Sequence, residues 1–343
     1  MNSRSGRAMA TTALINAQLW IGDGRSARGY VIIENAVIAD VGDGLPPDEL
    51  ADDVVDLAGM ALSPGLIDLM VLGGFGYSLL RDPPSQITRR YLRHGVTGIQ
   101  FCVASLPWSS LCRASQHVQE AIQEDSDAAA AVLGLYLEGP FQQPHLTGAS
   151  ARDFALAPTE ARVRALIDEM GAPVRMVNVA PGLEQDTAAI RQLVRAGKIV
   201  TMAHSDTPAS RVWPCLEAGT SVLGHIWDNG APVVGDSGVQ QPSIDHVALV
   251  DDRVKFIHLI CDGVHADPVM VRMTHRCRGV ETLCLVTDAN VASGCPDGTF
   301  QWDDGRTFVK SGGVCRTGEG WLSGSALLLP DMFRKFVSYT GAA

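Results

Sequence analysis

Short apolar runs that end in polar residues or glycine recur along the chain from about residue 61 onward. Segments with the spacing of amphipathic helices lie between them, for example at residues 158–170 and 186–197. Repeats of a strand followed by a helix predict an α/β fold, a (β/α)8 barrel of the TIM type. The eight runs cover residues 65–74, 97–105, 132–140, 174–182, 198–206, 221–229, 255–265 and 282–290.

A different pattern precedes the barrel. Residues 12–57 alternate apolar and polar positions and break at glycine and aspartate, which is typical of strands in a small sheet. The chain of 343 residues is long enough for one large domain and one small domain. We therefore expect a small β domain at residues 1–60, the barrel at residues 61–330 and a short C-terminal tail at residues 331–343.

Charge and composition limit the classes of partner that we expect for the protein. The formal net charge of −11 gives an acidic surface that repels phosphate backbones, so we do not expect a nucleic-acid partner. The N-terminal segment lacks the apolar core of a signal peptide, and no window reaches the roughly 18 apolar residues of a membrane span. The eight cysteines form no CxxC pair and are expected to be free thiols. Together these features indicate a cytoplasmic protein that acts on a small molecule away from membranes.

Reactive side chains follow five of the apolar runs. In TIM barrels the reactive groups lie at the C-terminal ends of the strands. A doubly wound sheet would use fewer strands, at one switch point, so contributions from five strands favour the barrel. The five residues are Glu138, His204, His225, His265 and Asp288.

These residue types suit metal-assisted hydrolysis. Two histidines and a glutamate are enough protein ligands for a hydrolytic Zn²⁺ that keeps one position open for water. A carboxylate such as Asp288 would take the water proton and deliver it to a leaving amine, and His265 would donate a hydrogen bond to the substrate. Structural roles stay open for each residue: a lone histidine at a strand end is more often structural, and Asp288 could cap the following segment.

Several motifs resemble those of the N-acetylglucosamine-6-phosphate deacetylase family in the amidohydrolase superfamily. ALSPGLID at residues 61–68 resembles the opening barrel strand of the superfamily, and LEGPF at residues 137–141 resembles the LEGP-aromatic motif of the deacetylases. The resemblance covers about residues 12–330. The motifs that follow in the family's order are MAHSDTPA (202–209), GHIWDNGAP (224–232), ICDGVHAD (260–267), LVTDA (285–289) and LSGSAL (322–327).

The resemblance implies roles for individual residues. It implies one divalent metal ion, expected to be Zn²⁺, at Glu138, His204 and His225. It implies Asp288 as the catalytic acid and base, and His265 as the residue that polarises the substrate amide. The implied substrate-contacting residues are His145, whose spacing from Glu138 is shorter than in the family, together with Asp228, Asn229, Leu322, Ser323 and Ser325.

The first departure from the superfamily concerns a second metal ion. Most amidohydrolases carry an HxH pair on the first barrel strand, and here Met70 and Leu72 stand at those positions. Neither side chain is a useful ligand for a hard hydrolytic metal ion. We therefore expect a site for one metal ion only.

Two further departures concern the substrate and the small domain. Asp236 falls near the position where the family uses an arginine to read the sugar phosphate, and a carboxylate there would repel a phosphate dianion. Part of that contact can come from a neighbouring subunit, so a homodimer stays open. Only 16 residues follow the LSGSAL motif, so we expect the N-terminal β-sandwich to be incomplete or finished differently.

The leading hypothesis is a divergent, metal-dependent deacetylase of an N-acetylated amino sugar or a related small amide. The substrate is expected to lack the phosphate and to belong to a specialised pathway. One alternative is an amidohydrolase that acts on an N-acyl amino acid or a cyclic amide. Another is a catalytically inactive homologue that kept the barrel.

Overall fold

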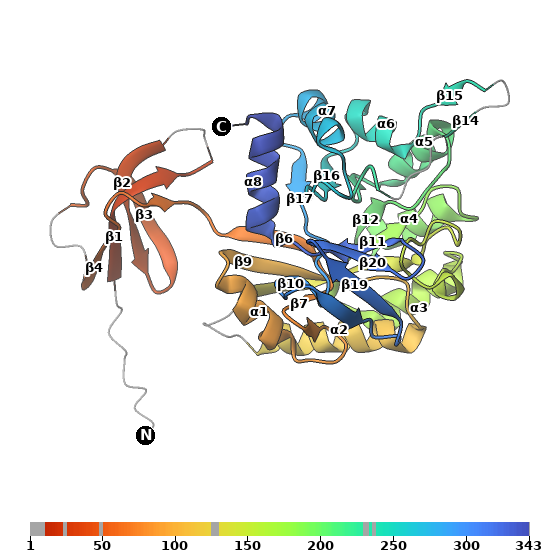
Figure 1. The fold of residues 1–343 in the computed structure, drawn as a ribbon, viewed down its shortest axis with the longest axis horizontal. Helices are drawn as coiled ribbons and strands as arrows, with labels where there is room; N and C mark the ends of the chain where they lie inside the picture. Colours follow the sequence, from red (N-terminus) through yellow and green to blue (C-terminus); the bar gives the residue numbers. More distant parts are fainter. Residues whose placement is uncertain are drawn as a thin grey trace. The chain divides into compact units, whose positions relative to one another are not determined.

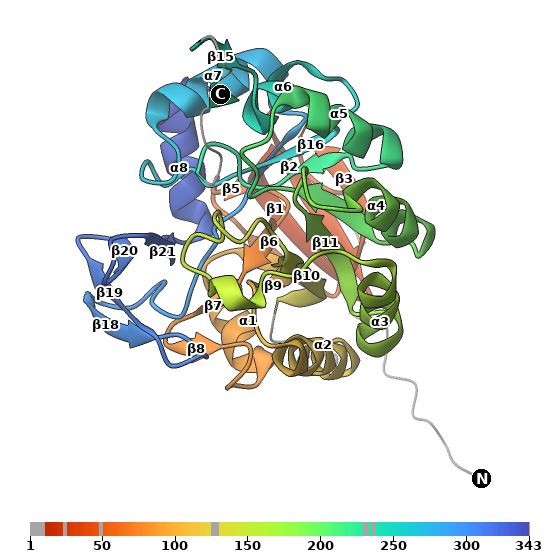
Figure 2. The same ribbon diagram turned by 90° about the vertical axis from the view of Figure 1, so that its right-hand side faces the viewer.

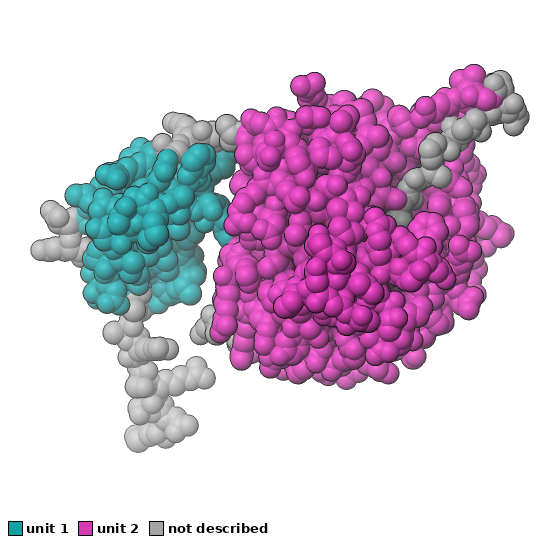
Figure 3. Space-filling model, in the orientation of Figure 1, with its two compact units in different colours: residues 1–65, 343 teal, residues 66–342 magenta. Residues whose placement is uncertain are grey.

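The computed structural model describes residues 11–22, 26–47, 51–124, 130–228, 233–234 and 238–342. Two compact units divide the chain, residues 1–65 with residue 343 and residues 66–342 (Figure 3). This division falls at residue 65, and the second unit includes residues 331–342. The domain boundaries expected at residues 60 and 330 stay predictions.

The smaller unit contains one mixed sheet with the strand order β3-β2-β1-β4, and β5 also pairs with β1. Successive side chains of a strand point to opposite faces, so Tyr30 and Val31 enter two separate apolar clusters. Within its described residues the unit has no second sheet of the expected sandwich. The strands are β1 (Thr11–Trp20), β2 (Ser26–Glu34), β3 (Val37–Asp43), β4 (Asp53–Asp56) and β5 (Ala61–Leu62).

The larger unit is the predicted barrel. Among the described residues, eight parallel strands pair in the order β6-β9-β10-β11-β12-β13-β16-β17, and each falls on one of the eight predicted runs. A parallel bridge between Val71 and Ala289 brings the first strand to the segment after the last one, so the barrel is nearly closed. The strands are β6 (Leu66–Val71), β9 (Val96–Val103), β10 (Ala131–Phe141), β11 (Val174–Val179), β12 (Ile199–Met202), β13 (Val222–Leu223), β16 (Phe256–Leu259) and β17 (Leu283–Leu285).

Helices lie outside the barrel strands, as Figure 2 shows for α2 to α8. Helix α3 covers one of the predicted helical segments: the Thr159 side chain accepts a hydrogen bond from the Arg162 amide at its start, and Gly171 ends it with a φ of 62°. The helices are α1 (Pro84–Leu92), α2 (Trp108–Gln123), the 3-10 turn η1 (Arg152–Phe154), α3 (Glu160–Met170), α4 (Asp186–Arg195), α5 (Ala209–Ala218), α6 (Ile244–Val250), α7 (Pro268–Arg278) and α8 (Leu329–Thr340).

Short antiparallel strands accompany the eight barrel strands (Figure 1). After β17 the chain forms a four-stranded sheet with the order β18-β19-β20-β21, which has its own small apolar cluster around Phe308. The pieces are β7 (Gly73–Gly74), β8 (Tyr77–Ser78), β14 (Val233–Val234), β15 (Gln240–Gln241), β18 (Gly298–Gln301), β19 (Thr307–Ser311), β20 (Val314–Thr317) and β21 (Leu322–Ser325).

Two expectations from composition concern the whole chain. All eight cysteines are free. Within the described part of the chain, no helix is long and apolar enough to cross a membrane.

Candidate metal centre and cavity

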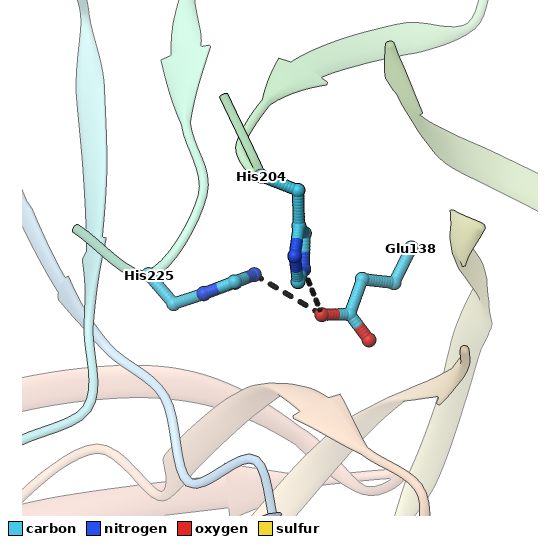
Figure 4. Close-up of side chains that lie close together, drawn as sticks. All are labelled: Glu138, His204 and His225. Carbon is cyan, nitrogen blue, oxygen red and sulfur yellow. Dashed lines mark hydrogen bonds and ion pairs between the residues drawn. The ribbon is translucent and has the colours of Figure 1, made fainter. Parts of the chain in front are cut away.

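Three side chains from neighbouring strands converge at one end of the barrel (Figure 4). Glu138 lies near the end of β10, His204 follows β12 and His225 follows β13. One ligand atom from each of the three residues lies within 4.8 Å of the other two, and all three residues are buried. The predicted metal ligands are therefore brought together by the C-terminal ends of parallel strands, as the barrel requires.

Hydrogen bonds fix the orientation of both histidine rings. His204 Nδ1 lies 2.6 Å from the carbonyl oxygen of Leu146, and His225 Nδ1 lies 2.8 Å from Asp228 Oδ1. A carbonyl or carboxylate oxygen only accepts, so each Nδ1 carries the proton. In a neutral ring with its proton on Nδ1, the Nε2 atom carries a free lone pair. Both Nε2 atoms lie next to the third residue, Glu138.

The two Nε2 atoms meet the same oxygen of Glu138. His204 Nε2 lies 2.8 Å and His225 Nε2 lies 3.2 Å from Glu138 Oε1. The His225 atom is buried and, within the described residues, makes no hydrogen bond of acceptable geometry. Lone pairs that face a carboxylate in this way need a cation or an added proton between them. A tetrahedral Zn²⁺ site separates its ligand atoms by roughly 3.3 Å, so the residues fit a metal ion of this kind.

The backbone at the strand ends adopts unusual conformations that aim these side chains. His204 and Asp288 have φ angles of 56° and 52°, and Trp227, between His225 and Asp228, has a φ of 81°. The left-handed region is sparsely populated by residues other than glycine and concentrates at functional sites. Each of these residues lies within four positions after the end of a barrel strand, where the chain changes direction beside the site.

Electrostatics in the site are dominated by the buried carboxylates. Burial alone would raise the pKa of Glu138, but the close contacts and the charges of His204 and His225 hold it below its ordinary value. Burial, and then the charge of Glu138, raise the pKa of Asp288 well above its ordinary range. The site therefore contains carboxylates that stay ionised, Glu138 and Asp228, and one, Asp288, that readily binds a proton.

His265 is held by a residue that the sequence analysis missed. Its Nδ1 lies 2.7 Å from Asp262 Oδ2, and its Nε2 lies 3.9 Å from Asp288 Oδ2. Burial acts to lower the pKa of His265, but the hydrogen bond and charge of Asp262 raise it. The motif DGVH contains this pair, because its aspartate is three residues before the histidine.

One cavity of about 170 Å³ connects these residues to the surface. Glu138, His204, Asp228, His265 and Asp288 line its inner end. The remaining lining comes from Leu72 and Leu79, from residues 102–106 at and after the end of β9, from residues 147–150, and from residues 302–304, 306, 321, 322 and 324. Trp302, Trp321 and Arg306 could not be predicted from the strand–helix pattern of the sequence, because they lie in turns of an antiparallel sheet that interrupts this pattern.

Only some of the residues expected to contact the substrate line the cavity. Asp228 and Leu322 line the cavity. Ser323 lies behind it and accepts a hydrogen bond from Trp302, while the Ser325 amide donates to the Asp288 carbonyl oxygen. The His145 side chain is 59% exposed and bonds to Asp206, and the structure does not place it in the cavity lining.

The structure describes the residues behind the departure at the second metal position but not Asp236 or Asn229. Met70 is 1% exposed, and Leu72 lines the cavity, so the position of a second metal ion is apolar. Asn229 and Asp236 lie outside the described residues, and their expected roles stay predictions.

Comparisons with known proteins identify similar deacetylases. The chain is 30% identical over 285 residues to N-acetylgalactosamine-6-phosphate deacetylase from Escherichia coli O157:H7, covering 82% of this chain and 73% of that protein. It is 26% identical over 321 residues to N-acetylglucosamine-6-phosphate deacetylase from Bacillus subtilis (strain 168), covering 92% and 79%. No protein-family model matches the chain.

A solved structure of similar fold is N-acetyl-D-glucosamine-6-phosphate deacetylase from Mycobacterium smegmatis, a variant in complex with N-acetyl-D-glucosamine-6-phosphate. The TM-score is 0.85 at 25% identity, and the match covers 97% of this chain and 85% of that one. These matches confirm the resemblance that the motifs indicated. The chain therefore belongs to the N-acetylglucosamine-6-phosphate deacetylase family of the amidohydrolase superfamily.

Proposed function

We propose that this protein hydrolyses the acetamide of an N-acetylated amino sugar and that Glu138, His204 and His225 hold one divalent metal ion, Zn²⁺, for this reaction. The observation that carries the proposal is the pair of histidine rings whose Nδ1 atoms are committed to Leu146 and Asp228, so that both Nε2 atoms face Glu138. Outer partners of this kind are the rule for metal-binding histidines. The relatives' shared activity supports the same reaction class.

The protein groups divide the work of amide hydrolysis between them. When bound, the metal ion supplies the Lewis acid that activates water and polarises the amide carbonyl. Asp288 takes the proton of the attacking water and delivers it to the nitrogen of the leaving amine. Its raised pKa suits this role, because a base that is too weak would not retain the proton long enough to transfer it.

His265 acts on the other side of the amide. Asp262 holds its Nδ1 and raises the pKa of the ring, which favours the form with a proton on Nε2 as well. We propose that this Nε2–H donates a hydrogen bond to the substrate carbonyl oxygen, whose negative charge grows as water attacks.

Metal analysis and acetate release test the proposal together. Purified protein should contain about one Zn²⁺ or similar ion per chain, and it should release acetate from N-acetylated hexosamines. His204→Ala should lose the metal and the activity, whereas His94→Ala, at an exposed histidine outside the site, should keep both. Hydrolysis of N-acyl amino acids but of no sugar would show that the substrate class is wrong. Protein that binds no metal after Zn²⁺ addition would support the inactive homologue.

A further inference from the structure

The part of the cavity away from the metal ligands is built on a tight turn between β18 and β19. The Trp302 amide donates to the Arg306 carbonyl oxygen at 2.8 Å, and the Gly305 amide donates to the Trp302 carbonyl oxygen at 3.0 Å. We propose that this turn, together with Trp321, forms a subsite that takes the uncharged ring of the sugar and disfavours a phosphorylated sugar. The inference rests on the proposed function and names the substrate class of the same cavity.

Trp302 has the properties of a fixed platform. Its Nε1–H donates to Ser323 Oγ at 2.8 Å, and its ring centre lies 5.1 Å from that of Phe308 with a tilt of 34°. Phe308 in turn stacks on Phe300 with ring centres 5.8 Å apart. The indole therefore cannot turn away when the cavity is empty, and it is part of the cavity lining. Because the ring is already ordered, ligand binding costs little of its conformational entropy.

Apolar side chains line the same cavity as this platform. Trp321 is 51% exposed and lines the same cavity, and Leu72, Leu79 and Leu106 line it as well. A hexosamine ring presents a face of C–H groups with hydroxyl groups around its edge. An indole beside aliphatic side chains complements such a face, because aromatic rings provide a large apolar area with a slightly negative surface.

The charged groups of the subsite already neutralise one another. Asp303 accepts a hydrogen bond from Ser78 Oγ at 2.6 Å and lies 3.1 Å from Arg81 Nε. Asp304 Oδ2 lies 2.8 Å from Arg306 Nε and 2.6 Å from Nη2 of the same residue. This pairing leaves neither an excess carboxylate for a cationic group nor an excess cation for an anionic one.

A phosphate group would therefore lack a partner here. Arg306 is the only arginine or lysine among the described residues that line the cavity. Its third guanidinium nitrogen, Nη1, donates to the Ala149 carbonyl oxygen at 2.6 Å, so all three nitrogens are engaged. A phosphate dianion would compete with the Asp304 carboxylate for Arg306 and would be repelled by both aspartates.

Paired assays test the subsite directly. The ratio kcat/KM for N-acetylglucosamine should exceed that for its 6-phosphate by about tenfold or more. Trp302→Leu should raise KM for the unphosphorylated sugar by about tenfold and leave kcat within about twofold, and Trp302→Phe should keep most of the affinity. Trp213→Leu, at an exposed tryptophan of α5 outside the cavity, is the matched control. Circular dichroism of each variant verifies folding.

A second variant tests the charge argument. Asp304→Asn removes the carboxylate partner of Arg306, so it should raise kcat/KM for the 6-phosphate severalfold relative to that for N-acetylglucosamine. Binding can be followed without turnover in Asp288→Asn protein. N-acetylglucosamine should change its tryptophan fluorescence, and the added Trp302→Phe substitution should remove most of that change.

The outcomes separate the two proposals. A preference for the 6-phosphate, with KM unaffected by Trp302→Leu, would overturn the subsite and leave the deacetylase function standing. Absence of acetate release from either sugar, with the fluorescence response intact and dependent on Trp302, would overturn the deacetylase function and leave the subsite standing.

Discussion

At the residue scale, the site depends on which atoms carry protons. The Nδ1 atoms of His204 and His225 are committed to oxygen acceptors, so their Nε2 atoms face Glu138, which stays ionised. Asp288 has a raised pKa because it is buried near the negative charge of Glu138. These four residues could be found in the sequence, but their protonation is set by neighbours such as Leu146, which no motif indicates.

Substitution of Asp288 tests its place in the mechanism. Asp288→Asn keeps the size of the side chain but cannot take a proton, so we expect kcat to fall by about 10²–10⁴-fold. Metal content should stay at about one ion per chain, because Asp288 is not part of the ligand group. Asp153→Asn, at an exposed aspartate in η1, should leave both quantities unchanged. Full activity in Asp288→Asn protein would remove this residue from the mechanism.

At the element scale, the barrel is closed by contacts between its first strand and the segment after its last one. The Leu72 and Gly73 amides donate to the Ala289 carbonyl oxygen at 2.8 and 3.1 Å. Deeper in the same seam, Asp68 accepts hydrogen bonds from the Thr287 hydroxyl at 2.6 Å and the Thr287 amide at 3.2 Å. The seam therefore supports the backbone that carries Asp288.

The seam makes stability depend on pH. Burial raises the pKa of Asp68 from 3.8 to about 6, despite the hydrogen bonds from Thr287. Because the folded protein binds this proton more strongly than the unfolded chain, the free energy of unfolding falls as pH rises from about 4 to about 6. The loss is about 3 kcal/mol for a shift of this size.

Asp68→Asn cannot titrate, so its metal-free form should lose this dependence. Its free energy of unfolding, relative to that of the metal-free natural protein, should rise by about 3 kcal/mol between pH 4 and pH 7. Denaturant titrations at several pH values measure the difference. Asp252→Asn, at an exposed aspartate, should follow the natural protein throughout. Parallel curves for Asp68→Asn and the natural protein would contradict the expected titration.

Helix α8 offers a second prediction at this scale. Phe336 is 6% exposed and packs in the barrel core cluster, whereas Phe333 on the same helix is 52% exposed. Phe336→Ala should reduce the free energy of unfolding by about 3–5 kcal/mol, because it leaves a cavity. Phe333→Ala is the matched control, with an expected change of about 1 kcal/mol or less. Equal effects of the two substitutions would show that α8 does not stabilise the barrel through its buried face.

At the scale of the whole molecule, the proposed metal ion would link three strands of the barrel, because its three ligands follow or end different strands. A ligand that binds only the folded state stabilises it, by about 4 kcal/mol when the free ligand is a thousand times its Kd. A chelator should therefore lower the thermal unfolding midpoint of the barrel as well as abolish acetate release, and Zn²⁺ should restore both. His204→Ala protein should show no such response. An unchanged midpoint in the natural protein would contradict metal binding at this site.

The local pattern of the sequence was sufficient to predict the barrel and the candidate metal ligands that the structure brings together. Strands buried on both faces need continuous apolar runs, and reactive groups of a barrel lie where those runs end, so Glu138, His204 and His225 could be found without coordinates. Sequence order could not show how far the loops between strands reach. His145 follows Glu138 closely in the chain, yet its side chain bonds to Asp206 outside the cavity lining.

The sequence by itself therefore determined the barrel, the family and the residue types at the candidate metal centre, because periodicity, motifs and strand ends are local properties of the chain. Only the tertiary structure decided the other end of the cavity. Trp302 and Arg306 come from a sheet that follows the last barrel strand, and Arg306 bonds to Ala149, which is 157 positions earlier in the chain. Contacts at such separation depend on how the chain folds back on itself, and that folding arranges this part of the cavity lining.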